Sequence, residues 1–82
     1  MKTTIVNNVL TSEKMFFTND LSLVDNMVNA IMHIEKNISN LLNENMRKKI
    51  IKENNLVEHT SKITEKPFVY CEKYDLYAYT EL

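Results

Sequence analysis

The segment SLVDNMVNAIMHIEKNISNLLNENMRKKIIKE, residues 22–53, decides the fold, because apolar residues recur at helical spacing for more than two turns only here. Written as heptads, the segment has apolar residues at successive a and d positions and an asparagine at the next a position. These positions are Val24, Ile31 and Ile38 (a), Met27, Ile34 and Leu41 (d), and Asn45 (a). The spacing predicts one long amphipathic helix over residues 22–53.

This stripe of seven residues also predicts how the chain assembles. β-Branched residues at a with Leu-like residues at d favour two-stranded pairing, and a single Asn at a fixes the register. We therefore expect a homodimer paired along the stripe. The alternative is that the stripe packs on the chain's own sheet, since further apolar residues widen it: Leu23, Val28, Ala30 and Leu42.

The length of the helix gives a second reason to consider a partner subunit. About 32 helical residues span about 48 Å, whereas a compact chain of this size has a radius of gyration of about 12 Å. An unbroken helix would overhang its own domain. Either a second subunit covers the overhang, or the helix breaks at residues 43–45 into two antiparallel pieces.

Strands are expected on both sides of the helix. β-Branched and aromatic residues predict strands at residues 3–10, 15–18, 68–71 and 76–80, and a further short strand near residues 61–64. Residues 11–18 are alternatively a short helix capped by Thr11. Ser22 and Asp25 form a capping box that begins the long helix, and Asn54-Asn55 ends it. The predicted fold is α+β, a single domain over residues 1–82. A small antiparallel sheet, made of an N-terminal hairpin and a C-terminal hairpin or meander, packs on one long central amphipathic helix.

Composition excludes several classes of function. The chain has no glycine, so it has neither a P-loop nor a dinucleotide-binding fingerprint, and its left-handed turns must use Asn, Asp or Lys. The net charge of −1 gives no long-range field that selects nucleic acid. Cys71 is the single cysteine, which excludes an internal disulfide. No Cys/His cluster indicates a metal, and no cofactor is expected, so oligomerisation is the remaining way to stabilise so small a core.

Localisation and origin follow from composition alone. No apolar run is long enough to span a bilayer, and the apolar segment at the N-terminus is too short for a signal peptide. We expect a cytoplasmic protein without membrane contact. The excess of Asn, Lys and Ile is typical of AT-rich coding sequences and suggests an accessory protein of a low-GC bacterium or its phage.

No side chain is nominated for catalysis. His33 and His59 lack the second ligand at helical spacing that builds a zinc site, and a lone Cys71 and histidine make no nucleophile pair without an orienting group. We expect all three residues to be dispensable and the protein not to be an enzyme. The basic residues Arg47, Lys48 and Lys52 are possible phosphate contacts, although they also complement the negative end of the helix dipole.

The tyrosines near the C-terminus are the candidate partner contacts. Tyr74, Tyr77 and Tyr79 combine large apolar area with a polar tip, as interface residues do. Strand alternation puts Leu76 and Ala78 toward the helix, and the rings of Tyr77 and Tyr79 on the opposite, exposed face. The alternative is that these rings fill the core.

The sequence therefore predicts a protein-binding module that contacts a larger host protein, as a phage or mobile-element regulator or inhibitor would. The alternative is a dimeric DNA-binding transcriptional regulator that uses the basic helix end. These two functions differ in salt dependence, because phosphate contacts weaken steeply as salt rises.

Overall fold

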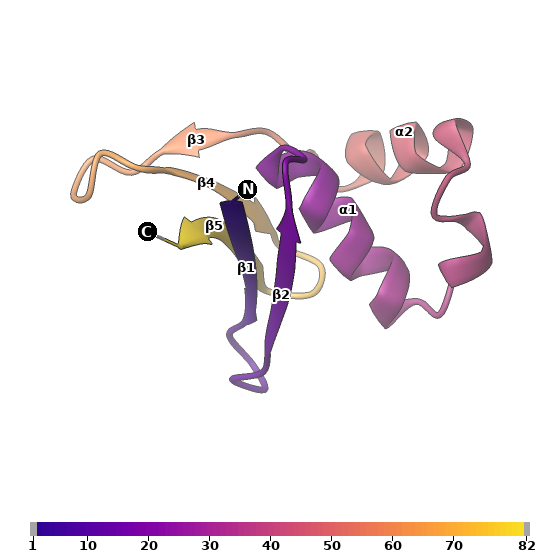
Figure 1. The fold of residues 1–82 in the computed structure, drawn as a ribbon, viewed down its shortest axis with the longest axis horizontal. Coiled ribbons are helices and arrows are strands. Elements are labelled where there is room, and N and C mark those ends of the chain that lie inside the picture. Colours follow the sequence, from indigo (N-terminus) through magenta and orange to yellow (C-terminus); the bar gives the residue numbers. More distant parts are fainter. Residues whose placement is uncertain (1, 82) are drawn as a thin grey trace.

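Two helices lie between an N-terminal and a C-terminal group of strands in the computed structural model, which describes residues 2–81 (Figure 1). The predicted α+β class is confirmed. In chain order the elements are β1 (Lys2–Asn8), β2 (Lys14–Asn19), α1 (Leu23–Ile34), the short 3₁₀ helix η1 (Ile38–Asn40), α2 (Glu44–Glu53), β3 (His59–Thr60), β4 (Pro67–Cys71) and β5 (Leu76–Glu81).

All neighbouring strands are antiparallel, in the order β2-β1-β5-β4-β3. The pairing of β1 with β5 joins the beginning of the chain to its end: Thr4 lies opposite Thr80, and Val6 lies opposite Ala78. Figure 1 shows these two strands side by side, with the two termini close together. The strands that the sequence separates most therefore pair inside the sheet.

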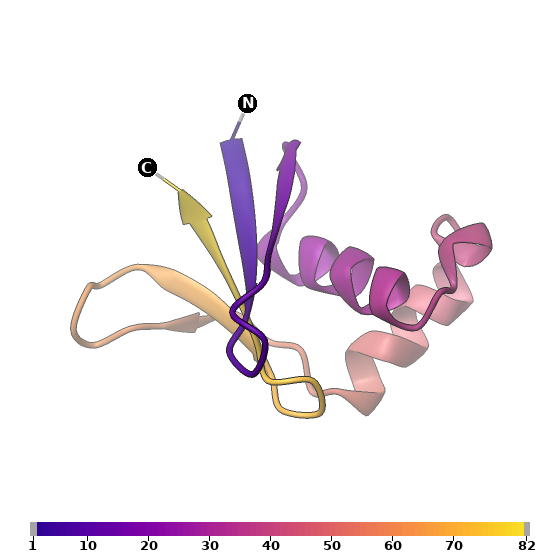
Figure 2. The ribbon, with the colours of Figure 1, turned by 90° about the horizontal axis from the view of Figure 1, so that it is seen from below.

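One face of the sheet carries the core. The strand residues that point to this face are almost fully buried against α1: Val6, Val69, Cys71, Leu76 and Ala78. The helix contributes Met27 and Ile31 among others, each of these two with 0% exposure, and α2 contributes Ile50. Both helices lie on the same side of β1, β2 and β5 (Figure 2), so α1 covers the sheet and α2 packs on α1.

The prediction of one unbroken helix is wrong. α1 ends at Ile34 because Lys36 adopts the left-handed conformation, with φ of 58°. The N–H of Lys36 donates to the His33 carbonyl at 3.1 Å, and the N–H of Asn37 donates to the Met32 carbonyl at 2.8 Å. This pair of bonds is a Schellman motif, which stops the helix and satisfies its last carbonyls.

The second helix begins where the alternative prediction placed a break. The side chain of Asn43 accepts the N–H of Met46 at 3.1 Å and so caps α2. α1 nevertheless ends well before Asn43, and η1 lies between the two helices. The expected end of the helical segment is confirmed, because α2 stops at Glu53 and Asn55 is left-handed, with φ of 53°.

The other local predictions have mixed outcomes. The N-terminal hairpin is present, so the short-helix alternative for residues 11–18 does not hold. Ser22 caps α1, its hydroxyl accepting the N–H of Asp25 at 3.1 Å. The prediction of a strand near residues 61–64 is wrong, because β3 is His59–Thr60. The hydroxyl of Ser61 instead accepts hydrogen bonds from two backbone N–H groups in the turn that follows.

Candidate functional site

The face of the sheet that points away from α1 carries a row of large side chains. Register places Ile5 between Phe16 on β2 and Tyr79 on β5, Tyr79 opposite Phe68 on β4, and Phe68 opposite His59 on β3. A second row places Tyr77 opposite Tyr70. We call this surface the open face and define it by seven residues: Ile5, Phe16, His59, Phe68, Tyr70, Tyr77 and Tyr79.

The rings of the open face support one another. The ring centroids of Tyr70 and Tyr77 are 4.6 Å apart, those of Phe68 and Tyr77 are 6.2 Å apart, and those of His59 and Phe68 are 5.5 Å apart. The hydroxyl of Tyr70 donates to the Asp75 carboxylate at 3.1 Å. Burial and this hydrogen bond raise the pKa of Tyr70. These contacts restrict the rings of the open face.

A groove of about 780 Å³ runs along part of the open face, beside the turn that joins β3 to β4. Its apolar lining comes from Ile5, Pro67, Phe68, Tyr77 and Tyr79. Lys66 and Glu81 add one charge of each sign to that lining. An apolar floor with a few polar groups is typical of a site that binds another molecule.

The three tyrosines predicted as partner contacts separate into two groups. Leu76 and Ala78 have 0% exposure against the helix, whereas Tyr77 is 38% exposed and Tyr79 is half-buried on the open face. The structure thus puts Tyr77 and Tyr79 where strand alternation predicts them. Their role as partner contacts stays a prediction.

Tyr74 lies apart from Tyr77 and Tyr79, in the turn between β4 and β5, and packs against the core. Its hydroxyl donates to the carboxylate of Glu35, just beyond the end of α1. That hydrogen bond, with burial, raises the pKa of Tyr74 to about 12. The Nζ atom of Lys73 lies 3.8 Å from the same carboxylate. Tyr74 therefore ties the strand turn to α1, and it is not part of the open face.

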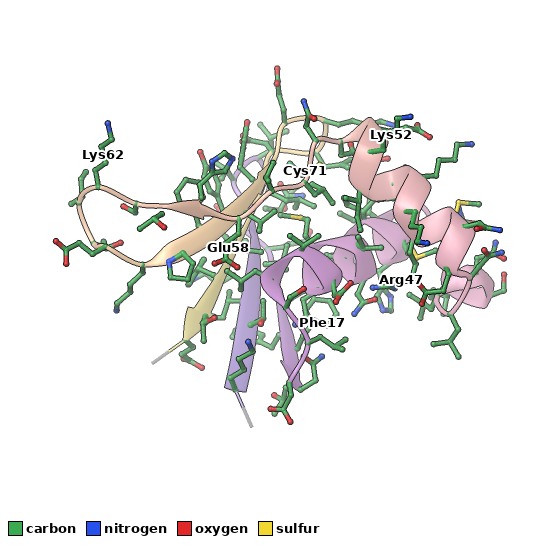
Figure 3. The ribbon with its side chains drawn as sticks, turned by 90° about the horizontal axis from the view of Figure 1, so that it is seen from above. Phe17, Arg47, Lys52, Glu58, Lys62 and Cys71 are labelled. Atoms are coloured by element: carbon green, nitrogen blue, oxygen red, sulfur yellow. The ribbon has the colours of Figure 1, made fainter. Side chains whose placement is uncertain are left out.

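Arg47, predicted as a phosphate contact, is occupied within the protein. Its Nη1 atom donates to the side-chain oxygen of Asn29 at 2.7 Å and to the Leu41 carbonyl at 2.9 Å, and its Nη2 atom donates to the Asp25 carbonyl at 3.1 Å. The same Nη2 atom is 3.6 Å from the Asp25 carboxylate, and only 11% of the Arg47 side chain is exposed. Figure 3 shows Arg47 where α2 meets α1. Lys48 and Lys52 remain exposed on α2.

The contacts of Arg47 continue into a polar network that the sequence did not predict. The amide of Asn29 donates to the side-chain oxygen of the fully buried Asn26 at 3.3 Å. Asn26 and Asn19 exchange two amide hydrogen bonds of 3.0 and 3.1 Å. The network connects α2, α1 and the end of β2. Its sequence signal is the pair Asn26 and Asn29, polar residues spaced three apart beside the apolar stripe.

The stripe predicted as a dimer interface does not form one surface. Met27 and Ile31 are fully buried against the chain's own sheet. The other five positions lie elsewhere: Val24, Ile34 and Leu41 are half-buried, Ile38 is 52% exposed in η1, and Asn45 is exposed on α2. Because α1 ends at Ile34, the later positions of the stripe lie in other segments and do not continue the same helix face. A homodimer stays a prediction, and it requires another surface.

In the part of the chain that the structure describes, Cys71 and His33 contact uncharged side chains. Cys71 is buried, its Sγ lies 3.7 Å from the side-chain oxygen of Asn54, and burial raises the pKa of the thiol. His33 is exposed beside Phe17. Within residues 2–81, no group of three or more His, Cys, Asp or Glu side chains is placed to hold a metal ion. No helix in that range is long and apolar enough to cross a membrane.

Comparisons with protein-family models, with curated proteins and with solved structures find no match for this chain. Two surfaces carry the side chains that the sequence nominates for binding: the open face and the basic side of α2. The open face joins large side chains from all five strands. On the basic side of α2, the Arg47 side chain is mostly buried and hydrogen-bonded within the protein.

Proposed function

We propose that the chain is a non-enzymatic protein-binding module that contacts a larger partner protein through the open face. The observation that carries this proposal is that the helices cover only one face of the sheet, although both faces bear large apolar side chains. An antiparallel sheet with one solvated face ordinarily alternates apolar and polar residues. On this face Phe16 and Tyr77 are exposed, whereas Ile5 is buried beneath its neighbours. Exposed large apolar side chains on a sheet face favour an interaction site.

The kind of ring on this face supports a protein partner. Tyr supplies a large rigid contact area at low entropy cost, and aromatic anchors dominate the binding energy of many protein interfaces. The contact between Tyr70 and Tyr77 restricts both rings before binding. Less side-chain entropy is then lost when a partner docks.

In its narrowest form the proposal is a cytoplasmic regulator or inhibitor, encoded by a phage or mobile element, that occupies a surface of a larger host protein. The small size of the chain and its composition rich in Asn, Lys and Ile support this form. The alternative, a dimeric DNA-binding regulator, would use the exposed Lys48 and Lys52 without Arg47, because Arg47 already makes three hydrogen bonds within the protein. Nothing in the geometry favours that alternative.

The test begins with capture of partners from a host lysate by the tagged protein. It is decided by variants of the open face. Replacing Tyr77 or Tyr79 by Ala should weaken binding of the captured protein by about 1–2 kcal/mol, or roughly tenfold. The double variant Lys48→Ala/Lys52→Ala is the matched control and should bind normally. Equal binding by all variants contradicts the proposal, and nucleic-acid retention lost only in the lysine variant supports the alternative.

A further inference from the structure

The outer edge of β2 has backbone groups that no other segment within residues 2–81 uses. The N–H of Asn8 donates to the carbonyl of Glu13 at 2.8 Å, which fixes the alternation along the hairpin. Met15, Phe17 and Asn19 therefore direct their N–H and C=O groups toward β1. Lys14, Phe16 and Thr18 direct theirs outward, and no backbone hydrogen bond from residues 2–81 reaches them on that side.

The two edges of the sheet differ in how they are protected. β3, at the far edge, has only two residues, so it offers little to an added strand. β2 has six residues and contains neither proline nor a bulge. Natural proteins seldom leave such an edge open, because it pairs with other chains. An isologous pair of β2 strands would close the edge and prevent further growth.

We propose that β2 pairs antiparallel with β2 of a second copy, about a two-fold axis at Phe16. Phe16 then lies opposite Phe16 of the second copy, and Lys14 lies opposite its Thr18. This register keeps the open faces of both copies on the same side. It uses all three outward-directed residues, so three residue pairs exchange two backbone hydrogen bonds each. A register centred on Phe17 would leave Lys14 without a partner inside β2.

The side chains beside this edge suit a second copy. Phe16 is 62% exposed on the open face. On the helix side, Leu21 is 43% exposed and Leu42 is 94% exposed. These two leucines line a groove of about 420 Å³ together with Phe17. In the proposed register Met15 of the second copy lies opposite Phe17, which points it toward this groove.

Charge is also compatible with self-pairing. Lys14 faces Thr18 of the second copy and not another lysine, so no like charges are opposed. This dimer does not depend on the proposed function, but it would join the two open faces into one surface.

The test uses the symmetry of position 16. Sedimentation equilibrium of the wild type should give a mass that rises from 9.7 kDa toward twice that value with concentration. Phe16→Lys and Phe16→Glu should each weaken dimerisation by about tenfold or more, because two like charges then face each other. An equimolar mixture of the two variants should dimerise again, because opposite charges meet at the axis. Circular dichroism confirms that each variant is folded.

Two further variants keep the test decisive. Thr18→Pro removes an outward N–H without removing a bond to β1, and it should also abolish the dimer. Tyr77→Lys changes the open face away from the edge and should leave the dimer intact while weakening partner binding. A wild type that is monomeric at every concentration overturns the proposal. So does a dimer that persists in Phe16→Lys, or a mixture of the position-16 variants that stays monomeric.

Discussion

Replacing Arg47 by Met should destabilise the protein strongly. The methionine keeps most of the aliphatic volume but removes three hydrogen bonds, to Asn29, Leu41 and Asp25, from a side chain that is only 11% exposed. Acceptors left without a donor in such surroundings cost about 1–3 kcal/mol each. Some of these acceptors will bind water instead, so we expect the free energy of unfolding to fall by about 3 kcal/mol. This value is at the low end for breaking a buried charged pair.

This loss is large for a chain of 82 residues. A domain of this size has a total stability of roughly 4–12 kcal/mol. At 4–8 °C per kcal/mol, the melting temperature should fall by about 12–24 °C. Urea denaturation followed by circular dichroism measures the change in the free energy of unfolding. Arg47→Lys should recover part of it, because lysine keeps the charge but lacks the planar fork of donors.

The matched control is Lys48→Met, one residue further along α2 and exposed. It should change stability by no more than about 0.5 kcal/mol. Equal stability of Arg47→Met and Lys48→Met would refute the reasoning. If Arg47→Met also abolished nucleic-acid binding while the fold stayed intact, the original interpretation of Arg47 as a phosphate contact would be restored.

Three other changes test particular contacts. Thr4→Val should stabilise the protein by about 1 kcal/mol in urea denaturation, because the Thr4 hydroxyl is fully buried with no hydrogen-bond partner among residues 2–81; a loss of stability would mean that the hydroxyl is satisfied. Lys36→Gly should stabilise by about 0.5–1 kcal/mol, because glycine adopts positive φ without the steric cost that lysine pays, whereas Lys48→Gly, at an ordinary helical position, should destabilise by a similar amount. The hydrogen bond from Tyr74 to Glu35 raises the pKa of Tyr74 from its ordinary value of 10.0 to about 12. Its contribution to the free energy of unfolding is complete below pH 10 and is lost as the pH rises toward 12, because the unfolded chain releases the tyrosine proton first. Spectrophotometric titration of Tyr74→Phe should lack one tyrosine in the highest-pH step, and the stability of the variant should depend less on pH in that window; loss of a tyrosine from the ordinary step near pH 10 instead would show that the hydrogen bond to Glu35 does not retain the proton of Tyr74.

Helix caps and the four longer strands were predictable because their signals are local, whereas the short β3 was misplaced. Alternation separated Leu76 and Ala78 from Tyr77 and Tyr79 without any knowledge of the fold. Ser22 and Asn54-Asn55 marked the two ends of the helical segment because their side chains and conformations satisfy helix ends wherever these occur.

The break after Ile34 was not predictable from periodicity. The apolar residues Ile38 and Leu41 keep the heptad phase across the break, although one lies in η1 and the other beyond it. A glycine at position 36 would have signalled the left-handed residue, but the chain has none and uses lysine there. The length argument identified the problem, because an overhanging helix would have left its second half without a core.

The open face needed register as well as alternation. Phe16, Ile5 and Phe68 join Tyr79 in one row only because β1 pairs with β5, and that pairing links opposite ends of the chain. Nothing local predicts such a contact. Arg47 is a similar case, since its acceptors come from α1 and from the segment before α2, and both are placed by the helix break.

The two faces of the sheet differ in how their side chains are held. On the helix side, the buried Asn26 and the guanidinium of Arg47 require specific partners, so changes there act on the fold. On the open face, Tyr77 contacts other rings and keeps access to solvent. Because the sheet separates the two sites, they share no partner, and their effects on stability should add in the double variant Arg47→Met/Tyr77→Ala. Coupling above about 0.5 kcal/mol in that double-mutant cycle would mean that the open face also holds the fold together.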